Sequence, residues 1–308
     1  MQKGMNKVVI VTRKTRLEEL KRRFNTIEQA RFYIEHLGAD FSDYMAEADQ
    51  YLAAFAVVRG IAEKYARVQV IDRDYVANMI FGDEDVVIAL GQDGQVANVM
   101  KYLDGQMLIG VNPDVKRWEG VLLPFEAGDL ERVLPEVIRK QRDTKTVTMG
   151  KAETTDGQVL YAVNDFFVGI DNHTSARYLL RYEDRTENQS SSGIIVSTGL
   201  GMTGWYRSVM AEFEGIADAF HMEVPKIEPI GWADRKLRFS VREPYPSKYT
   251  AATIVYGEVT DRDCLQVTSS MPERGVIFSD GVLEDSLAFN AGMKVTISVA
   301  DRVGRLVV

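Results

Sequence analysis

Short apolar runs alternate with helical patterns along the first half of the chain. The runs at 7–11, 68–71, 86–90 and 107–111 predict strands. Between them, apolar residues recur at spacings of three and four, most clearly over 52–65, and predict helices. Strands separated by helices are typical of a parallel, doubly wound sheet, so we expect a Rossmann-like α/β domain.

Two further helices are expected in this half. A charged helical stretch runs from about Leu17 to His36. The apolar spacing over 130–138 predicts another helix, which Pro135 should kink or split because proline removes a backbone donor and clashes with the preceding turn.

Beyond Lys140 the pattern changes to short strands separated by Gly, Pro and Asp. Asp156-Gly157 lies between two apolar runs and predicts a hairpin. The polar segment Glu183–Ser192 predicts a turn between strands at 178–182 and 194–196. Further short strands are expected at 239–241, 253–256, 265–268, 275–278 and 294–299. We therefore predict a β-sandwich domain, with the first domain over 1–143 and the second over 144–292.

The strand at 86–90 leads into Gly91-Gln92-Asp93-Gly94-Gln95, and helical spacing follows. Such a turn places backbone N–H groups at a helix N-terminus, where phosphate binds readily. Because carboxylate and phosphate repel, Asp93 indicates a base or a metal ligand beside a nucleotide; a solvated Asp in a tight turn is the alternative. Ligands of open α/β sheets bind beyond the carboxyl ends of the strands, where Asp93 and Asn112 are expected.

Composition limits the classes of protein to which the chain can belong. The 308 residues are enough for two domains, and 45% hydrophobic with 27% charged residues is ordinary for a globular protein. A net charge of −8 gives no support for nucleic-acid binding. No apolar run approaches the ~18 residues of a membrane-spanning helix. One cysteine allows no internal disulfide and fits a reducing compartment, so we expect a cytoplasmic protein. No His/Cys pair has the spacing of a zinc site.

Three segments resemble motifs of the NAD kinase family, in the family's order. Gly91–Gln95 is similar to the GGDGT motif, Asn164-Asp165 to an Asn-Glu pair, and Val196–Trp205 to a segment like VSTPTGSTAY. Two more stretches are similar to the mitochondrial-type branch of the family: 12–16 after the first strand, and 109–114 followed by Glu119-Gly120. The resemblance covers almost the whole chain.

The resemblance implies an α/β nucleotide domain followed by a β domain, with the last strand, within 293–308, returning to the first domain. It also implies a reaction in which the γ-phosphate of ATP moves to the 2′-hydroxyl of the adenosine ribose of NAD, giving NADP. ATP and a divalent metal, usually magnesium, are the implied cofactors. A homodimer or homotetramer is expected, with no nucleic-acid or membrane partner.

By resemblance, Asp93 accepts the ribose proton or orients that hydroxyl, in a nucleotide loop that also contains Gly91, Gln92, Gly94, Gln95 and Asn112. Arg13, Lys14 and Arg16 would meet the ATP phosphates, although a solvated basic turn is at least as strong an alternative from the sequence. The implied NAD-binding residues are Asn164, Asp165, Thr198, Gly201, Thr203, Gly204, Trp205 and Ser208. A polar strand end is the alternative for Asn164-Asp165, and core packing is the alternative for Trp205.

The chain departs from the family pattern in two loops. Gln92 and Gln95 replace a glycine and the threonine of GGDGT, and Met202 replaces a hydroxyl side chain. If the replaced glycine needs a positive φ, Gln92 costs about 1 kcal/mol or more of strain. The expected function is an NAD-kinase-like phosphotransferase. The alternatives are a non-catalytic NAD(P)-binding regulatory homologue and a kinase acting on another hydroxyl substrate, such as a sugar or lipid.

Overall fold

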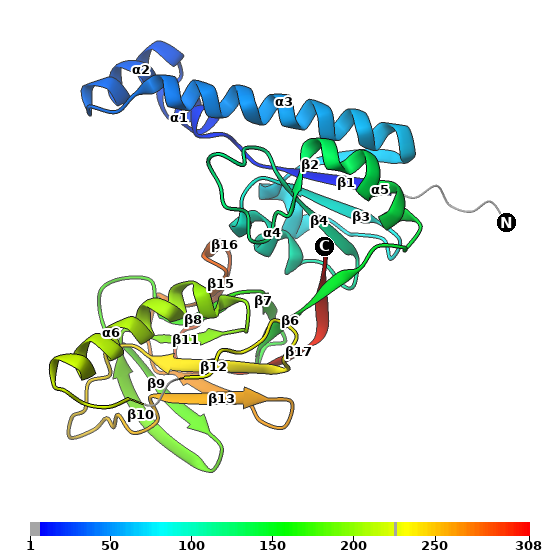
Figure 1. The fold of residues 1–308 in the computed structure, drawn as a ribbon. Helices are drawn as coiled ribbons and strands as arrows, with labels where there is room; N and C mark the ends of the chain where they lie inside the picture. Colours follow the sequence, from blue (N-terminus) through cyan, green and yellow to red (C-terminus); the bar gives the residue numbers. More distant parts are fainter. Residues whose placement is uncertain (1–6, 225–226) are drawn as a thin grey trace. The chain divides into compact units, whose positions relative to one another are not determined.

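The computed structural model describes residues 7–224 and 227–308, which form two compact units (Figure 1). Unit 1 comprises Met1–Lys145 and Arg305–Val308, and unit 2 comprises Thr146–Gly304. The returning segment is therefore shorter than the predicted 293–308. The reason is that most of the last strand, β17 (Lys294–Val307), pairs inside unit 2 before its end enters unit 1.

Unit 1 is built on a parallel sheet with the strand order β2-β1-β3-β4. Both β5 and the end of β17 lie alongside β4, again in parallel. These strands are β1 (Lys7–Thr12), β2 (Arg67–Asp72), β3 (Val86–Leu90), β4 (Met107–Asn112) and β5 (Phe125–Glu126). Four of them match predicted runs closely, because buried parallel strands are nearly continuous in apolar residues.

Helices cover both faces of this sheet (Figure 1). Val86, Ile88 and Leu90 of β3 share a core with α3 and α5. Val87 and Ala89 point to the opposite face and are completely buried as well, where α4 packs against β3 and β4. The helices are α1 (Arg16–Phe24), α2 (Ile27–His36), α3 (Phe41–Tyr65), α4 (Asp93–Met100) and α5 (Leu130–Ile138), with 3₁₀ turns η1 (Arg73–Asn78) and η2 (Ala127–Asp129).

Two helix predictions for this unit are corrected. The stretch 17–36 is two helices, because Asn25 has a φ of 62° and Thr26 starts α2 by accepting a hydrogen bond from the Gln29 N–H. The helix over 130–138 is confirmed, but the split that Pro135 was expected to cause is wrong, since α5 continues through that residue. Burial of its apolar face against the core of α3 and β3 outweighs the hydrogen bond that proline removes.

Unit 2 contains two sheets that pack around one shared core, as expected for a sandwich. One is a six-stranded antiparallel sheet with the order β13-β12-β11-β8-β15-β16. The other contains β10-β9-β14-β17 together with β6 and β7. The core joins Leu180 of β9 to Phe239 of β12. Bounds are β6 (Thr144–Thr154), β7 (Val159–Ala162), β8 (Asp165–Ile170), β9 (Ala176–Tyr182), β10 (Arg185–Ser191), β11 (Ile194–Ser197), β12 (Lys236–Val241), β13 (Tyr256–Thr260), β14 (Leu265–Ser269), β15 (Gly275–Ser279) and β16 (Val282–Ala288).

The structure also corrects predictions in unit 2. The segment 183–192 is not a polar turn: β10 pairs with β9 through a two-residue connection, with Arg185 opposite Tyr182. The strand expected at 253–256 begins only at Tyr256. Three elements were not predicted from the sequence: β16, the 3₁₀ turn η3 (Gly201–Thr203) and helix α6 (Trp205–Ala219). Across the described ranges, no helix has the length and apolarity needed to cross a membrane.

Candidate functional site

Asp93 is the first residue of α4, directly beyond the carboxyl end of β3. The Gly91 N–H donates to the Val111 carbonyl at 3.1 Å and ties this turn to β4. Asp93 Oδ1 accepts a hydrogen bond from the Leu122 backbone N–H at 2.6 Å. The other carboxylate oxygen, Oδ2, accepts no hydrogen bond from the described part of the chain. The chain thus holds Asp93 through one carboxylate oxygen and leaves the other able to accept a hydrogen bond or a proton.

The altered residues of this loop are accommodated without backbone strain. Gln92 caps α4 with a φ of −119°, which any residue adopts, so the strain expected there is absent. Gln95 is 2% exposed, and its Nε2 donates to the Val11 carbonyl at 2.9 Å. A Cβ on Gly91 would overlap the Gln95 Oε1 atom. Gln95 therefore bridges the ends of β1 and β3 and fills the space above Gly91.

Asn112, at the end of β4, shapes the loop that reaches Asp93. Its Oδ1 accepts from the Asp114 N–H at 3.0 Å, and its Nδ2 donates to the Trp118 carbonyl at 3.0 Å. A Cβ on Gly110 would overlap the carbonyl oxygen of Leu122, so the returning loop lies directly on the strand. The loop brings the Leu122 N–H to Asp93 as a result.

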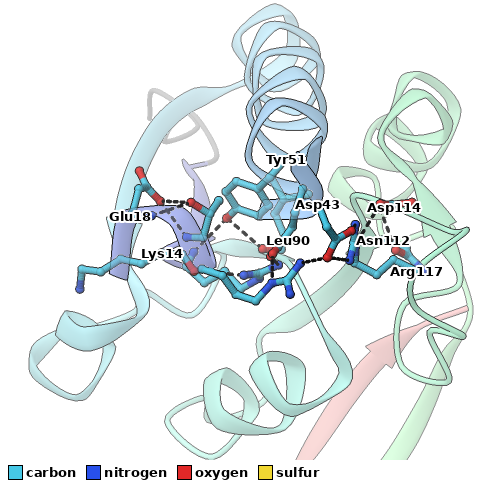
Figure 2. A network of polar contacts seen from close by, with 12 residues as sticks. Lys14, Glu18, Asp43, Tyr51, Leu90, Asn112, Asp114 and Arg117 are labelled. Atoms are coloured by element: carbon cyan, nitrogen blue, oxygen red, sulfur yellow. Dashed lines mark hydrogen bonds and ion pairs between the residues drawn. The ribbon is translucent and has the colours of Figure 1, made fainter. Parts of the chain in front are cut away.

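A group of charged side chains joins the ends of β1, β3 and β4 to α3 (Figure 2). We call Arg13, Arg16, Asp43, Glu47, Tyr51 and Arg117 the strand-end network. Arg13 is 8% exposed and donates to Glu47 at 2.9 Å. The Tyr51 hydroxyl accepts from the Arg13 N–H at 2.9 Å and donates to the Leu90 carbonyl at 3.1 Å. This network fixes the turn after β1 against α3.

The other basic residues of the turn are paired too. Arg16 bonds to Glu47 and, at 2.7 Å, to Asp43, while Lys14 pairs with Asp74. Arg117 from the β4 loop binds both oxygens of Asp43, at 2.5 and 3.1 Å (Figure 2). The three residues predicted to meet ATP phosphates therefore lie against carboxylates in this structure, and Arg13 is not part of a solvated turn.

Electrostatics within the network favour its charged form. Hydrogen bonds from Arg117 and Arg16 hold the pKa of the Asp43 carboxyl well below its usual range. Burial opposes ionisation of Glu47, but its hydrogen bonds to Arg16 and Arg13 outweigh burial and lower its pKa. Burial raises the pKa of the Tyr51 hydroxyl to about 12. At neutral pH the network consists of ion pairs and a protonated tyrosine.

In unit 2, the structure brings together four of the predicted NAD-binding residues. The Thr198 N–H donates to the Asn164 carbonyl at 2.9 Å, and the Thr198 Oγ1 accepts from the Gly201 N–H at 3.2 Å. A Cβ on Gly201 would overlap the carbonyl oxygen of Asn164. Asn164, Asp165, Thr198 and Gly201 thus form one corner at the start of β8, which we call the β8 corner.

Asp280 belongs to this corner and was missed from the sequence. Its carboxylate accepts from the backbone N–H groups of Val163 at 3.0 Å, Asn164 at 2.6 Å and Asp165 at 3.2 Å. Asp280 and Gly281, with φ of 54° and 72°, form the two-residue turn between β15 and β16. An Asp-Gly pair between strands signals such a hairpin. The N–H groups that the Asp280 carboxylate binds lie 115–117 residues away in the sequence, so no local pattern could predict these contacts.

The remaining predicted NAD-binding residues lie at the start of α6. The Trp205 ring stacks on Phe167, with 5.6 Å between centroids, and the Arg242 guanidinium lies 5.4 Å from the Trp205 ring centre. Met202 packs against the same cluster, so the replaced hydroxyl position is filled by an apolar contact. Thr203, Gly204 and Ser208 are exposed. Trp205 combines core packing with a partly accessible ring.

Comparison with known proteins shows which known fold the chain shares. Neither a protein-family model nor a curated protein sequence matches the chain. Among solved structures, the chain is similar to yeast NADH kinase complexed with NADH, with a TM-score of 0.60 and 12% identity. The match covers 100% of this chain and 84% of that one. The chain has the fold of this NADH kinase. The predicted NAD-kinase-like fold is therefore confirmed.

The kinase-like fold does not come with an assembled metal site. In residues 7–224 and 227–308, no three His, Cys, Asp or Glu side chains are grouped so that they could hold a metal ion. The described residues do not fit a magnesium ion held by the protein alone. Magnesium keeps several waters and often takes phosphate oxygens of its substrate as ligands. A nucleotide would have to supply most of the ligands here.

A separate groove of about 810 Å³ lies within unit 2, between α6 and strands β12 and β13. Its walls are mostly apolar and include Val209, Met210, Phe213 and Ile216 of α6. None of the predicted NAD-binding residues lines it. Pockets of this size commonly bind small molecules, but the residues that the sequence predicted for nucleotide binding lie elsewhere, at Asp93 in unit 1 and at the β8 corner in unit 2.

Proposed function

We propose that this protein is an NAD-kinase-like phosphotransferase, which moves the γ-phosphate of ATP to the 2′-hydroxyl of the adenosine ribose of NAD and releases ADP and NADP. The observation that carries the proposal is the anchored carboxylate of Asp93, at the start of a helix beyond a parallel strand. The NADH kinase fold supports it, since the same architecture occurs in a protein solved with NADH.

In the proposed reaction, the ribose oxygen attacks the γ-phosphorus and the bond from that phosphorus to the β-γ bridging oxygen breaks. Asp93 accepts the proton of the attacking hydroxyl. The Leu122 N–H holds one carboxylate oxygen at 2.6 Å, which leaves the second oxygen to meet the hydroxyl. A general base needs this positioning before it needs an unusual pKa.

The β8 corner would hold the adenosine part of NAD. A carboxylate such as Asp165 accepts two ribose hydroxyls well, and the Asn164 amide can both donate and accept. Thr198 and Gly201 support this role by fixing the backbone of Asn164 through the 2.9 Å hydrogen bond and the close approach described above.

The direct test is formation of NADP from NAD, ATP and magnesium, measured with an NADP-specific coupled assay. Asp93→Asn should reduce the rate by about 10²-fold or more, because it removes the proton acceptor. Asp104→Asn, an exposed aspartate of the same unit, is the matched control and should leave the rate unchanged. Equal rates for the Asp93→Asn variant and the wild type would reject the proposal.

A second candidate is a dinucleotide-binding protein that does not transfer phosphate. The strand-end network favours it, because the basic side chains near the expected donor phosphates are already paired with carboxylates. In this case NAD or NADP raises the melting temperature and ATP does not. Kinase function predicts stabilisation by ATP as well, so a thermal-shift series with the three nucleotides separates the two candidates.

A further inference from the structure

The contacts of Asp280 form an anion-binding arrangement that is filled from within the chain. Three successive backbone N–H groups, those of residues 163–165, converge on its carboxylate at 3.0, 2.6 and 3.2 Å. Such runs of N–H groups usually make a concave site for phosphate or another anion. In the reverse direction, the Asp280 N–H donates to the Asp165 carbonyl at 3.0 Å. The β15–β16 turn therefore fixes the backbone that carries Asn164 and Asp165.

Asp165 is the unusual member of this corner. It is 6% exposed, and within the described chain nothing donates a hydrogen bond to its carboxyl group. Strand β11 places Ser197 opposite it, and η3 brings no charged side chain. Strand β15 ends at Ser279, and Asp280 follows in the turn. The Asp165 carboxyl group is thus largely buried and receives no hydrogen bond from the chain, and a ligand that brings donors would satisfy it.

We propose that Asp280 is a positioning residue, which holds Asn164 and Asp165 for an uncharged, hydroxyl-rich part of a ligand such as the ribose diol of a dinucleotide. Phosphate is disfavoured at this corner because Asp280 already occupies the N–H groups and two carboxyl groups lie side by side. Hydroxyl donors would satisfy Asp165. The ligand class rests on the proposed function, whereas the positioning role depends only on the geometry of unit 2.

The arrangement makes binding sensitive to pH. Burial and the negative charge of Asp280 raise the pKa of Asp165 to about 7. The ionised carboxylate accepts two hydroxyl donors, and the protonated form accepts less well. NAD affinity should therefore fall as the pH drops through about 7. Removing the charge of Asp280 should move the midpoint to lower pH.

The experiment measures NAD binding to the full chain by calorimetry between about pH 5.5 and 8.5, a range that brackets the pKa of Asp165. Asp280→Ala should weaken binding at the upper pH by about tenfold, since three hydrogen bonds to a charged group are lost. Asp280→Asn keeps an acceptor, so it should lose less than about threefold there and move the midpoint about one pH unit lower. Asp156→Asn, in the exposed β6–β7 hairpin turn, is the matched control and should behave as wild type.

A second measurement needs no ligand. In Asp280→Ala, the backbone amides of 163–165 should exchange hydrogen at least about tenfold faster than in wild type. In Asp280→Asn, the carboxyl carbon of Asp165 should titrate at lower pH by NMR. Unchanged exchange and an unchanged titration would overturn the positioning role. If both change as expected while no variant binds NAD, the proposed function and the ligand class fail and the positioning role stands.

Discussion

In unit 1, the buried carboxylate of Glu47 lies against two arginines, whereas in unit 2 the buried carboxyl of Asp165 lies beside another carboxylate. Burial pushes the pKa of both groups upward. Hydrogen bonds from Arg16 and Arg13 reverse that effect at Glu47, while Asp280 adds to it at Asp165. The partner of a buried carboxyl group, more than its burial, decides whether the group is ionised at neutral pH.

This difference bears on function. The strand-end network compensates its own charges, so a phosphate entering there must compete with carboxylates for each arginine. The β8 corner keeps a carboxyl group without a donor, so a ligand that brings hydroxyl groups replaces no existing contact. Unit 2 is therefore better prepared for its proposed ligand than unit 1 is for donor phosphates. The altered residues do not follow this contrast, since Gln92 and Gln95 lie in unit 1 and Met202 lies in unit 2.

The largest effect should come from removing the acid at the centre of the strand-end network. Glu47→Ala leaves the Arg13 guanidinium buried without its carboxylate, and should lower the free energy of unfolding by about 3–5 kcal/mol. Urea denaturation measures this change. The matched control is Glu63→Ala, which removes the exposed pair with Arg59 on the same helix and should cost less than about 0.5 kcal/mol. Similar losses in both variants would mean that Glu47 does not compensate a buried charge.

In contrast to Glu47→Ala, Asp165→Asn should raise the free energy of unfolding, by an amount that depends on pH. The folded-state pKa of about 7 lies above the ordinary 3.8, so wild-type protein loses stability as the pH rises between these values. The variant lacks this loss and should be more stable by about 2–4 kcal/mol at pH 8, with little difference near pH 4. Thermal or urea unfolding at the two pH values tests this.

Asp263→Asn is the matched control for that comparison, since Asp263 is an exposed aspartate of unit 2. It should change stability by less than about 0.5 kcal/mol at either pH. If Asp165→Asn proves destabilising at pH 8, Asp165 has a compensating partner and the contrast between the two units disappears.

A smaller effect is expected at the link between the network and Asp93. Arg117→Gln removes the two hydrogen bonds to Asp43 in a partly exposed pair, and should cost about 1 kcal/mol. The loop that carries Leu122 is then held less firmly, so the Leu122 amide should exchange hydrogen faster. Arg274→Gln, which breaks the exposed pair with Asp171 in unit 2, should leave that amide unchanged. Equal exchange of the Leu122 amide in both variants would show that the strand-end network does not hold the loop that contacts Asp93.

The sheet of unit 1 was predictable because its strands are buried on both faces and read as continuous apolar runs. Helix α6 was not, because its apolar positions follow a glycine-rich segment that reads as part of a loop motif. The break at Asn25 depends on one residue in a left-handed conformation. The continuation through Pro135 depends on tertiary burial, which local rules do not contain.

The candidate site, like the fold, contains residues that could be predicted from the sequence and residues that could not. Asp93 could be found from its turn between a strand and a helix, and Asn164-Asp165 from their resemblance to a family motif. Their partners could not be found in this way, since the Leu122 N–H lies 29 residues from Asp93, and the Asp280 carboxylate lies 115 or 116 residues from Asp165 and Asn164. The pairing of Arg13 with Glu47 was hidden for the same reason, because no spacing rule connects a strand end to the second turn of a helix far along the chain.

The smallest effect should come from restoring the family glycine in the altered loop. Gln92 has a φ of −119°, so glycine relieves no strain there and only adds freedom to the unfolded chain. Gln92→Gly should therefore lower the free energy of unfolding by about 0.5–1 kcal/mol. Gly94→Ala is the informative control: Gly94 has an ordinary φ and open space around its Cα, so alanine should be neutral or slightly stabilising. A stabilised Gln92→Gly variant would mean that this loop carries strain after all. If the variant instead gains NADP formation while losing stability, the side chain of Gln92 obstructs the phosphate donor and not the fold, and the difference between the two units is one of ligand access.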